Sequence, residues 1–332
     1  MRNLTRRLSR ALLAPLAAGL ALAACSPTLA TVARSRESMG TVINITAAAR
    51  EQRQAEEAVE AAFAEFRRLD GLLSHYADSS EVGRLNREGR LAGPSPELEA
   101  NIRKSLEYGR LSAGAFDITV QPILELYDHT FRELKRAPTG EEVRQTLRRV
   151  DYRRIELGDG FIRLGPGQKI TLGGIAKGYA VDRALAIMRG RGVRHALVDA
   201  GGDIRAMGRA EGRRDWLVAL RNPRDPSDFI TRIRASDLAV LTSGDYERYY
   251  DPEKKFHHII NPLTGYSATE LISVTIVGPA AFDADALATS VFVLGLEKGT
   301  KMIESLKGYE GLLITRDRQI HRTAGFARYE LP

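Results

Sequence analysis

Cys25 is the only cysteine in the chain, and this limits what can hold the fold together. A single thiol excludes an internal disulfide, a CxxC redox pair and a zinc site built from cysteines. The fold must therefore rest on a hydrophobic core. With 332 residues, 43% of them apolar, the chain is long enough to bury one, as one large domain or two small ones.

Residues 1–24 have the pattern of an export signal. Four arginines precede the apolar run 11–24, which would rise about 21 Å as a helix and so falls short of a bilayer core of about 30 Å. Leu22-Ala-Ala-Cys25 resembles the lipobox of bacterial lipoproteins, which predicts a lipid anchor on Cys25. An ordinary signal peptide that ends beside a buried cysteine is the alternative.

This interpretation places the mature chain outside the cytoplasm. We expect a tether over residues 25–36, one domain over 37–332, and a location at the periplasmic face of the bacterial inner membrane. The pair Arg6-Arg7 leaves twin-arginine export open beside the Sec route. The formal net charge of +7 falls to +3 without Arg2, Arg6, Arg7 and Arg10, so charge gives no reason to expect a nucleic-acid partner.

Hydrophobic periodicity predicts a mixed α+β protein without internal repeats. Alternation over 40–46 predicts a strand, and helical spacing predicts helices over 52–73 and from the Ser95-Pro96 cap to about residue 112. A solvent-exposed helix is expected within 128–157. Further strands are expected at 196–198, 216–220, 274–277 and 312–315, and further helices near 177–189, 283–294 and 297–307, ended by Gly190, Gly295 and Gly308.

Two segments have the residue types of an anion site and a metal site. Gly173, Gly174 and Lys177 lie between a strand end and a helix, where backbone N–H groups and an ammonium group can face a phosphate. The spacing fits neither a P-loop nor GxGxxG, and a plain turn is the alternative. Asp285 and Thr289 are four residues apart on a helix, so two hard oxygen donors share one face, as in a Mg²⁺ half-site; capping by Asp283 is the alternative.

A pair of histidines, His257 and His258, precedes a Pro-x-Thr-Gly turn. Histidine is the side chain most readily tuned to act as a base near neutral pH, although a histidine beside a turn is often exposed and inert. Two further glycine-led turns carry Asp117 and Asp203.

Taken in order, these segments resemble the ApbE family. The resemblance covers nearly the whole predicted mature chain and implies an α+β fold related to the T-fold, forming a single catalytic unit with an FAD cleft. It rests on seven motifs: 39–41 (MGT), 74–76 (SHY) with Ser80-Glu81 and Asn86, 115–117 (AFD), 172–182 (LGGIAKGYAVD), 201–203 (GGD), 258–265 (HIINPLTG) and 285–289 (DALAT).

The resemblance also implies an activity: Mg²⁺-dependent transfer of FMN from FAD to a threonine hydroxyl of a target protein, with release of AMP. The expected partners are FAD, a threonine-bearing target such as a redox-pump subunit, and the membrane through the lipid anchor. Two alternatives remain. One is an FAD-binding maturation lipoprotein of the kind that accompanies nitrous-oxide reductase, and the other is a Mg²⁺-dependent FAD pyrophosphatase.

The family pattern further implies roles for individual residues. His258 falls on the family's catalytic base, and the metal ligands are expected from Asp285, Thr289 and backbone oxygens near Gly174 and Ala288. Two positions depart from the pattern, because Thr171 and Asn261 each replace a usual aspartate; the second change removes a charge beside His258 and is expected to lower its proton affinity. The expected FAD-binding residues are Met39, Tyr76, Ala115, Phe116, Asp117, Thr171, Lys177 and Ile260.

Overall fold

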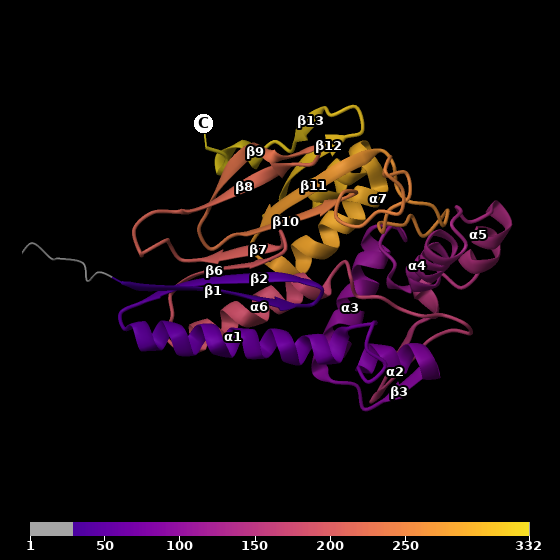
Figure 1. Ribbon diagram of the computed structural model, residues 1–332, viewed down its shortest axis with the longest axis horizontal. Helices are drawn as coiled ribbons and strands as arrows, with labels where there is room; N and C mark the ends of the chain where they lie inside the picture. Colours follow the sequence, from indigo (N-terminus) through magenta and orange to yellow (C-terminus); the bar gives the residue numbers. More distant parts are fainter. Residues whose placement is uncertain (1–28, 332) are drawn as a thin grey trace, which may run out of the picture.

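The computed structural model describes residues 29–331 (Figure 1). The predicted export signal and Cys25 lie outside the described residues. Within the described part of the chain, no helix combines the length and the apolar character needed to cross a membrane.

An eight-stranded sheet forms the centre of the fold, and every neighbouring pair of its strands is antiparallel. Its order is β1-β2-β6-β7-β10-β11-β12-β13. The strands are β1 (Ala30–Ser38), β2 (Thr41–Ala49), β6 (His195–Ala200), β7 (Ile204–Met207), β10 (Ala239–Gly244), β11 (Leu271–Gly278), β12 (Glu310–Thr315) and β13 (Ile320–Arg322).

Three long helices pack on one face of this sheet: α1 (Gln52–Leu73), α6 (Ala176–Gly190) and α7 (Ala281–Ser305). The hairpin of β8 (Trp216–Asn222) and β9 (Asp225–Ala235) supplies a second apolar cluster that packs with side chains of β10, β11 and β12. Because both faces of β11 are covered, all eight of its residues are buried, which explains its unbroken run of mostly β-branched residues.

A smaller, mainly helical part lies beside the C-terminal end of α1 (Figure 1). Ser95 caps one of its helices by accepting a hydrogen bond from the Leu98 N–H at 3.2 Å, as predicted. Its elements are α2 (Glu81–Glu88), α3 (Pro96–Leu111), α4 (Gln121–Asp128), α5 (Gly140–Leu147) and a small sheet of β3 (Arg90–Ala92), β5 (Phe161–Arg163) and β4 (Glu156–Gly158). Short 3-10 or π segments of this part occupy Ile118–Val120, His129–Glu133 and Tyr152–Arg154, whereas the 3-10 segment Phe326–Tyr329 packs beside β9 and β12 of the core.

Two predictions about element boundaries are wrong. The predicted tether, residues 25–36, overlaps β1, which pairs with β2 from Ala30 to Ser38. Only Val32 of β1 is buried, so this edge strand is held mainly by backbone hydrogen bonds and has no apolar alternation to reveal it. Gly190 is the last residue of α6, and the left-handed residue that follows is Gly192, with φ of 83°.

Candidate active site

A cavity of about 490 Å³ opens between the helical part and the core sheet. The turn between β1 and β2, the loops after α1 and α3, the N-terminal ends of α6 and α7, and the end of β10 contribute to its wall. Ala288 is not in this wall but is buried within α7. The other predicted site residues all line the cavity: Met39, Tyr76, Ala115, Phe116, Asp117, Thr171, Gly174, Lys177, His258, Ile260, Asp285 and Thr289.

One wall of the cavity carries two buried carboxylates and one ammonium group. Lys177 forms an ion pair with Asp203, whose side chain is 4% exposed. Asp285 accepts a hydrogen bond from the Gly178 N–H at 2.9 Å. Burial and the nearby Asp203 carboxylate raise the pKa of Asp285 to about 8. Although burial works against it, the carboxylates of Asp203 and Asp285 raise the pKa of Lys177 above its ordinary value.

Glycine permits the close approach of α6 and α7 that assembles this wall. A Cβ atom on Gly178 would lie 2.3 Å from the carbonyl oxygen of Ala281 and 2.8 Å from Cβ of Asp285, so no larger residue fits without a shift of the helices. The turn before Asp203 also needs glycine, because Gly201 and Gly202 have φ of 68° and 96°. Asp203 had no role in the sequence prediction, although it lies in one of the motifs.

The oxygen donors on the same wall fit a magnesium ion. A Cβ on Gly174 would lie 2.9 Å from Oγ1 of Thr289, which places this backbone beside the threonine hydroxyl. Among the described residues, no three His, Cys, Asp or Glu side chains are grouped as metal ligands. A metal here would be held by the Asp285 carboxylate, the Thr289 hydroxyl, backbone oxygens and substrate oxygens. This donor set suits Mg²⁺, whose charge would stabilise the buried Asp285 carboxylate.

The alternative interpretation of this helix, capping by Asp283, is wrong. Ala280 occupies the N-cap position of α7. The Asp283 carboxylate instead accepts hydrogen bonds from Nζ of Lys104 at 2.9 Å and from the Tyr108 hydroxyl at 3.2 Å. Asp283 therefore links α7 to α3, and it does not line the cavity.

The two adjacent histidines have different surroundings. His258 lines the cavity, and its Nδ1 lies 3.0 Å from the carbonyl oxygen of Arg248, which also accepts the His258 N–H at 3.1 Å. A carbonyl only accepts, so in the neutral ring Nδ1 carries the proton and Nε2 is an acceptor. Burial and the Arg248 guanidinium lower the pKa of His258 to about 3.

His257, in contrast, is a structural residue. It is 1% exposed, and both of its ring nitrogens lie within hydrogen-bond distance of backbone groups, Nε2 at 2.7 Å from the Ala268 carbonyl and Nδ1 at 3.2 Å from the Ile259 N–H. Among the described residues, His75 and His258 are the histidines that line the cavity, and in His258 the carbonyl contact at Nδ1 leaves Nε2 as the acceptor nitrogen.

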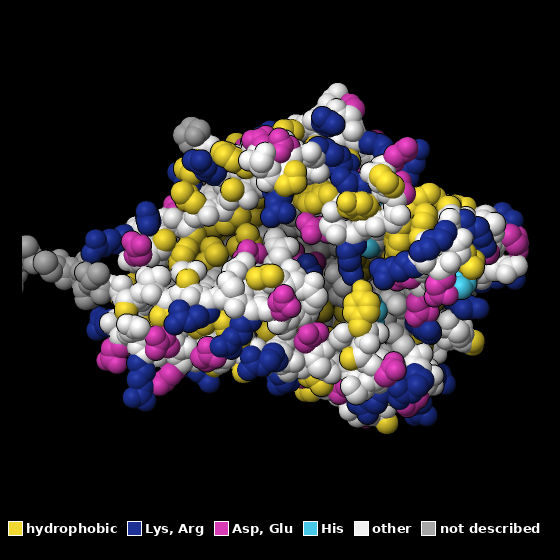
Figure 2. Space-filling model, in the orientation of Figure 1, with side chains coloured by type: hydrophobic (Ala, Val, Ile, Leu, Met, Phe, Trp, Pro, Cys, Tyr) yellow, Lys and Arg dark blue, Asp and Glu magenta, His cyan; other side chains and the backbone are white. Residues whose placement is uncertain are grey.

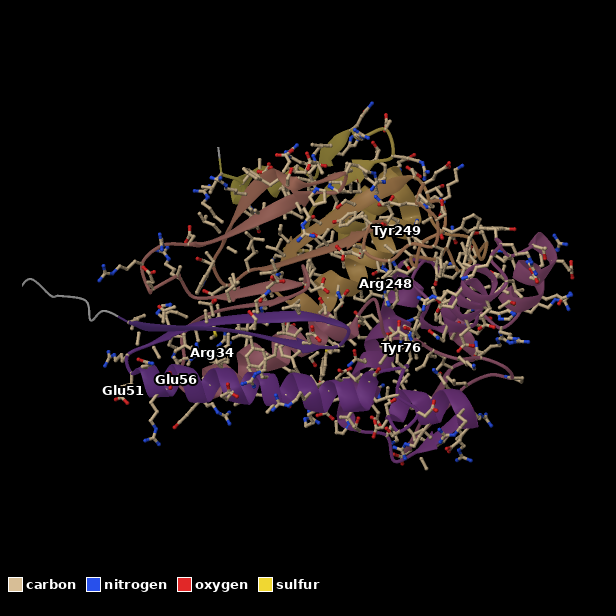
Figure 3. The ribbon with its side chains drawn as sticks, in the orientation of Figure 1. Arg34, Glu51, Glu56, Tyr76, Arg248 and Tyr249 are labelled. Carbon is tan, nitrogen blue, oxygen red and sulfur yellow. The ribbon has the colours of Figure 1, made fainter. Side chains whose placement is uncertain are left out.

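An arginine and a tyrosine meet at the mouth of the cavity. Nη1 of Arg248 donates to the Tyr76 hydroxyl at 3.0 Å, and Figure 3 shows the two side chains approaching from the loop after β10 and the loop after α1. Tyr76 is 74% exposed. An exposed aromatic ring at a cavity mouth is suited to stacking on a flat ligand ring. Sequence reasoning missed Arg248, because it lies in none of the recognised motifs.

The two positions that depart from the family pattern have clear structural surroundings. Oγ1 of Thr171 lies 3.2 Å from Nδ1 of His75, whose pKa burial and the Arg248 charge lower to about 4. A neutral threonine–histidine contact therefore stands at the position of the usual aspartate. Oδ1 of Asn261 accepts the Leu263 N–H at 2.9 Å, which stabilises the turn; no hydrogen bond joins Asn261 to His258 within residues 29–331.

Other motif residues support the cavity wall. The carboxylate of Asp117 lines the cavity but accepts the N–H groups of Thr119 at 2.7 Å and Tyr152 at 2.8 Å, so it fixes its own loop and joins it to the segment that begins at Tyr152. Asn86 exchanges two hydrogen bonds, of 2.9 and 2.7 Å, with the backbone of Ile170, directly before Thr171. These side chains hold the segments that carry the site.

Comparisons with known proteins agree with this geometry. The sequence matches the profile of the ApbE family over residues 39–313. A Treponema pallidum protein named FAD:protein FMN transferase is 32% identical, over 81% of this chain and 80% of that protein. A Haemophilus influenzae protein of the same name is 26% identical, over 87% and 88%. The crystal structure of the ApbE protein from Thermotoga maritima has a TM-score of 0.83 at 31% identity and covers 91% of this chain and 100% of that chain.

Proposed function

This chain belongs to the ApbE family, and from that premise we propose that it is an FAD:protein FMN transferase. The observation that carries the proposal is that one cavity holds both a histidine with an acceptor nitrogen and a buried Lys177, Asp203 and Asp285 cluster. The first suits removal of a proton from a hydroxyl group. The second suits binding of a pyrophosphate and a divalent cation.

The cavity offers separate groups to the parts of FAD. Its volume lies in the range of small-molecule sites. Lys177 and the N-terminal backbone of α6 face the pyrophosphate, since ammonium groups and helix N-termini favour anions. Tyr76 at the mouth offers its ring to the flavin. We place Met39, Phe116 and Ile260 against the apolar parts of the substrate.

We propose that Asp285, Thr289 and the backbone at Gly174 hold Mg²⁺. When bound, the ion supplies positive charge to the pyrophosphate and to the departing phosphate. Lys177, which forms an ion pair with Asp203, contributes further positive charge to the same region.

His258 then acts on the acceptor. A threonine hydroxyl of the target protein gives its proton to Nε2 of His258 as its oxygen forms a bond to the FMN phosphorus. The bond from that phosphorus to the bridging oxygen breaks, and AMP leaves with this oxygen. The Arg248 carbonyl keeps the ring in the required tautomer throughout, because it accepts the Nδ1 proton.

We further propose that the enzyme works at the periplasmic face of the inner membrane, with a lipid anchor on Cys25. The lipobox-like residues before Cys25 and the short apolar run support this location. Mass spectrometry of the N-terminal peptide tests it, because a diacylglyceryl group on Cys25 is expected and an unmodified thiol contradicts it.

The transferase proposal is tested by mixing the purified chain with FAD, Mg²⁺ and a flavoprotein domain from a candidate redox pump. After denaturation, we expect flavin fluorescence to remain on the domain, and to be absent when EDTA replaces Mg²⁺. Intact FAD would indicate a binding protein, and free FMN with AMP would indicate a pyrophosphatase; either result without labelled protein contradicts a transferase.

A further inference from the structure

Three loops meet where the described chain begins. A Cβ on Gly212 would lie 3.1 Å from Cδ1 of Leu29 and 3.5 Å from Nε2 of His195. Ala30 pairs with Ala49, at the end of β2. Nε2 of Gln54 donates to the carbonyl oxygen of Arg191 at 2.9 Å. The loops between β2 and α1, between α6 and β6, and between β7 and β8, taken with adjoining residues as 49–54, 189–195 and 208–215, therefore form one end of the molecule. The N-terminal residues leave from this end, and we call it the arginine end.

Positive charge is concentrated at the arginine end. Its three loops contain eight arginines, all exposed, and three carboxylates, Glu51, Glu211 and Asp215. Their net charge of +5 exceeds the +3 of residues 11–332, so the rest of that chain is slightly negative. Figure 2 shows Lys and Arg side chains around this end, where the grey residues begin. The arginines are Arg50, Arg53, Arg189, Arg191, Arg194, Arg209, Arg213 and Arg214.

Most of this charge is not neutralised within the described chain. Arg53, Arg209 and Arg214 have carboxylate partners, at 2.7 Å from Glu57, 3.6 Å from Asp215 and 3.3 Å from Glu211. The other five arginines have no carboxylate within 4.0 Å among residues 29–331. The Asp237 carboxylate also lies near this end, where it accepts the Gly208 N–H at 3.0 Å. An exposed, unneutralised arginine cluster favours a surface that presents many anionic groups.

We propose that the arginine end rests on anionic phospholipids and orients the enzyme on the membrane. The inference rests on the proposed lipid anchor. Only four residues separate Cys25 from Ala30, so a fully extended chain would span about 17 Å between them. The anchored protein must therefore hold its arginine end close to the lipid headgroups, within about two Debye lengths at physiological salt.

The same contact sets the position of the active site. The nine residues of β1 span about 30 Å, and Met39, directly after them, lines the cavity. Figure 3 shows Glu51 at the arginine end and Tyr76 with Arg248 well away from it along the molecule. A docked arginine end thus holds the cavity mouth about 30 Å from the lipid, where it faces acceptor domains that stand above the membrane.

The test uses the full, lipid-anchored chain on vesicles. Because Cys25 is the only cysteine and is acylated in this account, an engineered cysteine accepts a single fluorescent donor. Gln52→Cys places the donor at the arginine end, and Gln145→Cys places it on α5, near the opposite end in Figure 1; both residues are exposed. Energy transfer to headgroup-labelled acceptor lipid is compared between phosphatidylcholine vesicles and vesicles with 30% phosphatidylglycerol.

On the anionic vesicles we expect at least twofold higher transfer from the Gln52→Cys donor than from the Gln145→Cys donor. The ratio should fall toward one on neutral vesicles, in 0.5 M salt, and when Arg50, Arg189, Arg191, Arg194 and Arg213 are all replaced by Gln. A control variant replaces by Gln five arginines that lie outside the arginine end and line a second cavity. This variant should keep the wild-type ratio of energy transfer; the replaced residues are Arg87, Arg90, Arg149, Arg154 and Arg163.

Equal transfer from both donors on anionic vesicles would overturn the proposal, even if the arginine end captured an RNA or an acidic protein in parallel assays. A preference that persisted in the variant lacking the five arginines would overturn it as well. Flavin transfer to a soluble acceptor tests the proposed function. Recovery of the protein bound to neutral vesicles tests the lipid anchor. Failure of either is therefore distinguishable from failure of the docking surface.

Discussion

The Nδ1 atom of His258 lies 3.0 Å from the carbonyl oxygen of Arg248. A backbone acceptor fixes the tautomer of the ring whatever the side chain of residue 248 is, and it leaves Nε2 as the acceptor nitrogen. The same residue thus orients the proposed base through its backbone and lowers the pKa of that base through its guanidinium.

The His258→Asn variant is expected to remove the base while keeping the hydrogen bond to the Arg248 carbonyl. The Asn amide nitrogen is expected to replace Nδ1 as donor to the Arg248 carbonyl, but it offers no base. We expect a normal thermal unfolding curve and a flavin-transfer rate lower by about 10²–10⁴-fold, the usual contribution of a general base. Transfer at the wild-type rate by a folded His258→Asn variant would contradict the role given to this residue.

Much of the fold could be predicted from the sequence, because the strongest signals are local. The apolar stripe of α1 and the Ser95-Pro96 cap of α3 define those helices at the predicted residues. Edge strand β1 and the short strand β7 bury too few side chains to give a periodic signal. Gly295, with φ of 80°, interrupts α7 as predicted for a helix end.

The sequence predicts which residues form the site better than it predicts the contacts between them. Motif order identified residues that the fold brings to one cavity, yet pairing of Lys177 with Asp203 joins α6 to the turn after β6 and depends on tertiary structure. Arg248 lies in none of the motifs, so nothing in the sequence indicates that it belongs to the site. The contact of His75 with Thr171 likewise joins residues 96 positions apart, which spacing alone does not reveal.

Removal of Lys177 tests the buried charge cluster. Lys177→Met leaves the Asp203 and Asp285 carboxylates buried without their ammonium partner, and we expect the free energy of unfolding to fall by about 2–4 kcal/mol. Lys177→Met combined with Asp203→Asn should recover part of that loss, while FAD binding stays weakened in both. Urea unfolding and FAD titration measure the two effects; strictly additive destabilisation would contradict the pairing.

Gly178→Ala tests the close approach of α6 and α7. The added methyl group would lie 2.3 Å from the Ala281 carbonyl oxygen, so we expect a loss of about 1–3 kcal/mol in unfolding free energy and reduced transfer, because Lys177 and Asp285 must move apart. Gly190→Ala, at the end of the same helix with nothing within 4 Å of its Cβ position, is the control and should be neutral or slightly stabilising. Equal effects at both positions would show that packing at Gly178 is not special.

The two cavity histidines make stability depend on pH in a defined direction. Burial lowers the pKa of His75 to about 4 and that of His258 to about 3, below the ordinary value of 6.5. Below pH 6.5 the unfolded chain therefore binds protons that the folded chain does not, and stability is lost as the pH falls. At pH 5 we expect each histidine to contribute on the order of 1 kcal/mol of this loss, allowing for solvent exposure.

His75→Gln measures that contribution. Between pH 7 and pH 5, urea unfolding of His75→Gln should lose less stability than the wild type, because one of the two suppressed protonations is gone. An identical pH dependence in both proteins would mean that His75 titrates normally in the folded state.

The central claim is tested most directly by the balance of products in a single reaction. Purified chain, FAD, Mg²⁺ and an acceptor domain are incubated, and AMP, free FMN and the intact mass of the acceptor are measured together. The account predicts one AMP for each acceptor that gains FMN with loss of one water, located on a threonine, with little free FMN, and both products forming about 10²–10⁴-fold more slowly with His258→Asn. AMP matched by free FMN, with an acceptor of unchanged mass, would contradict it.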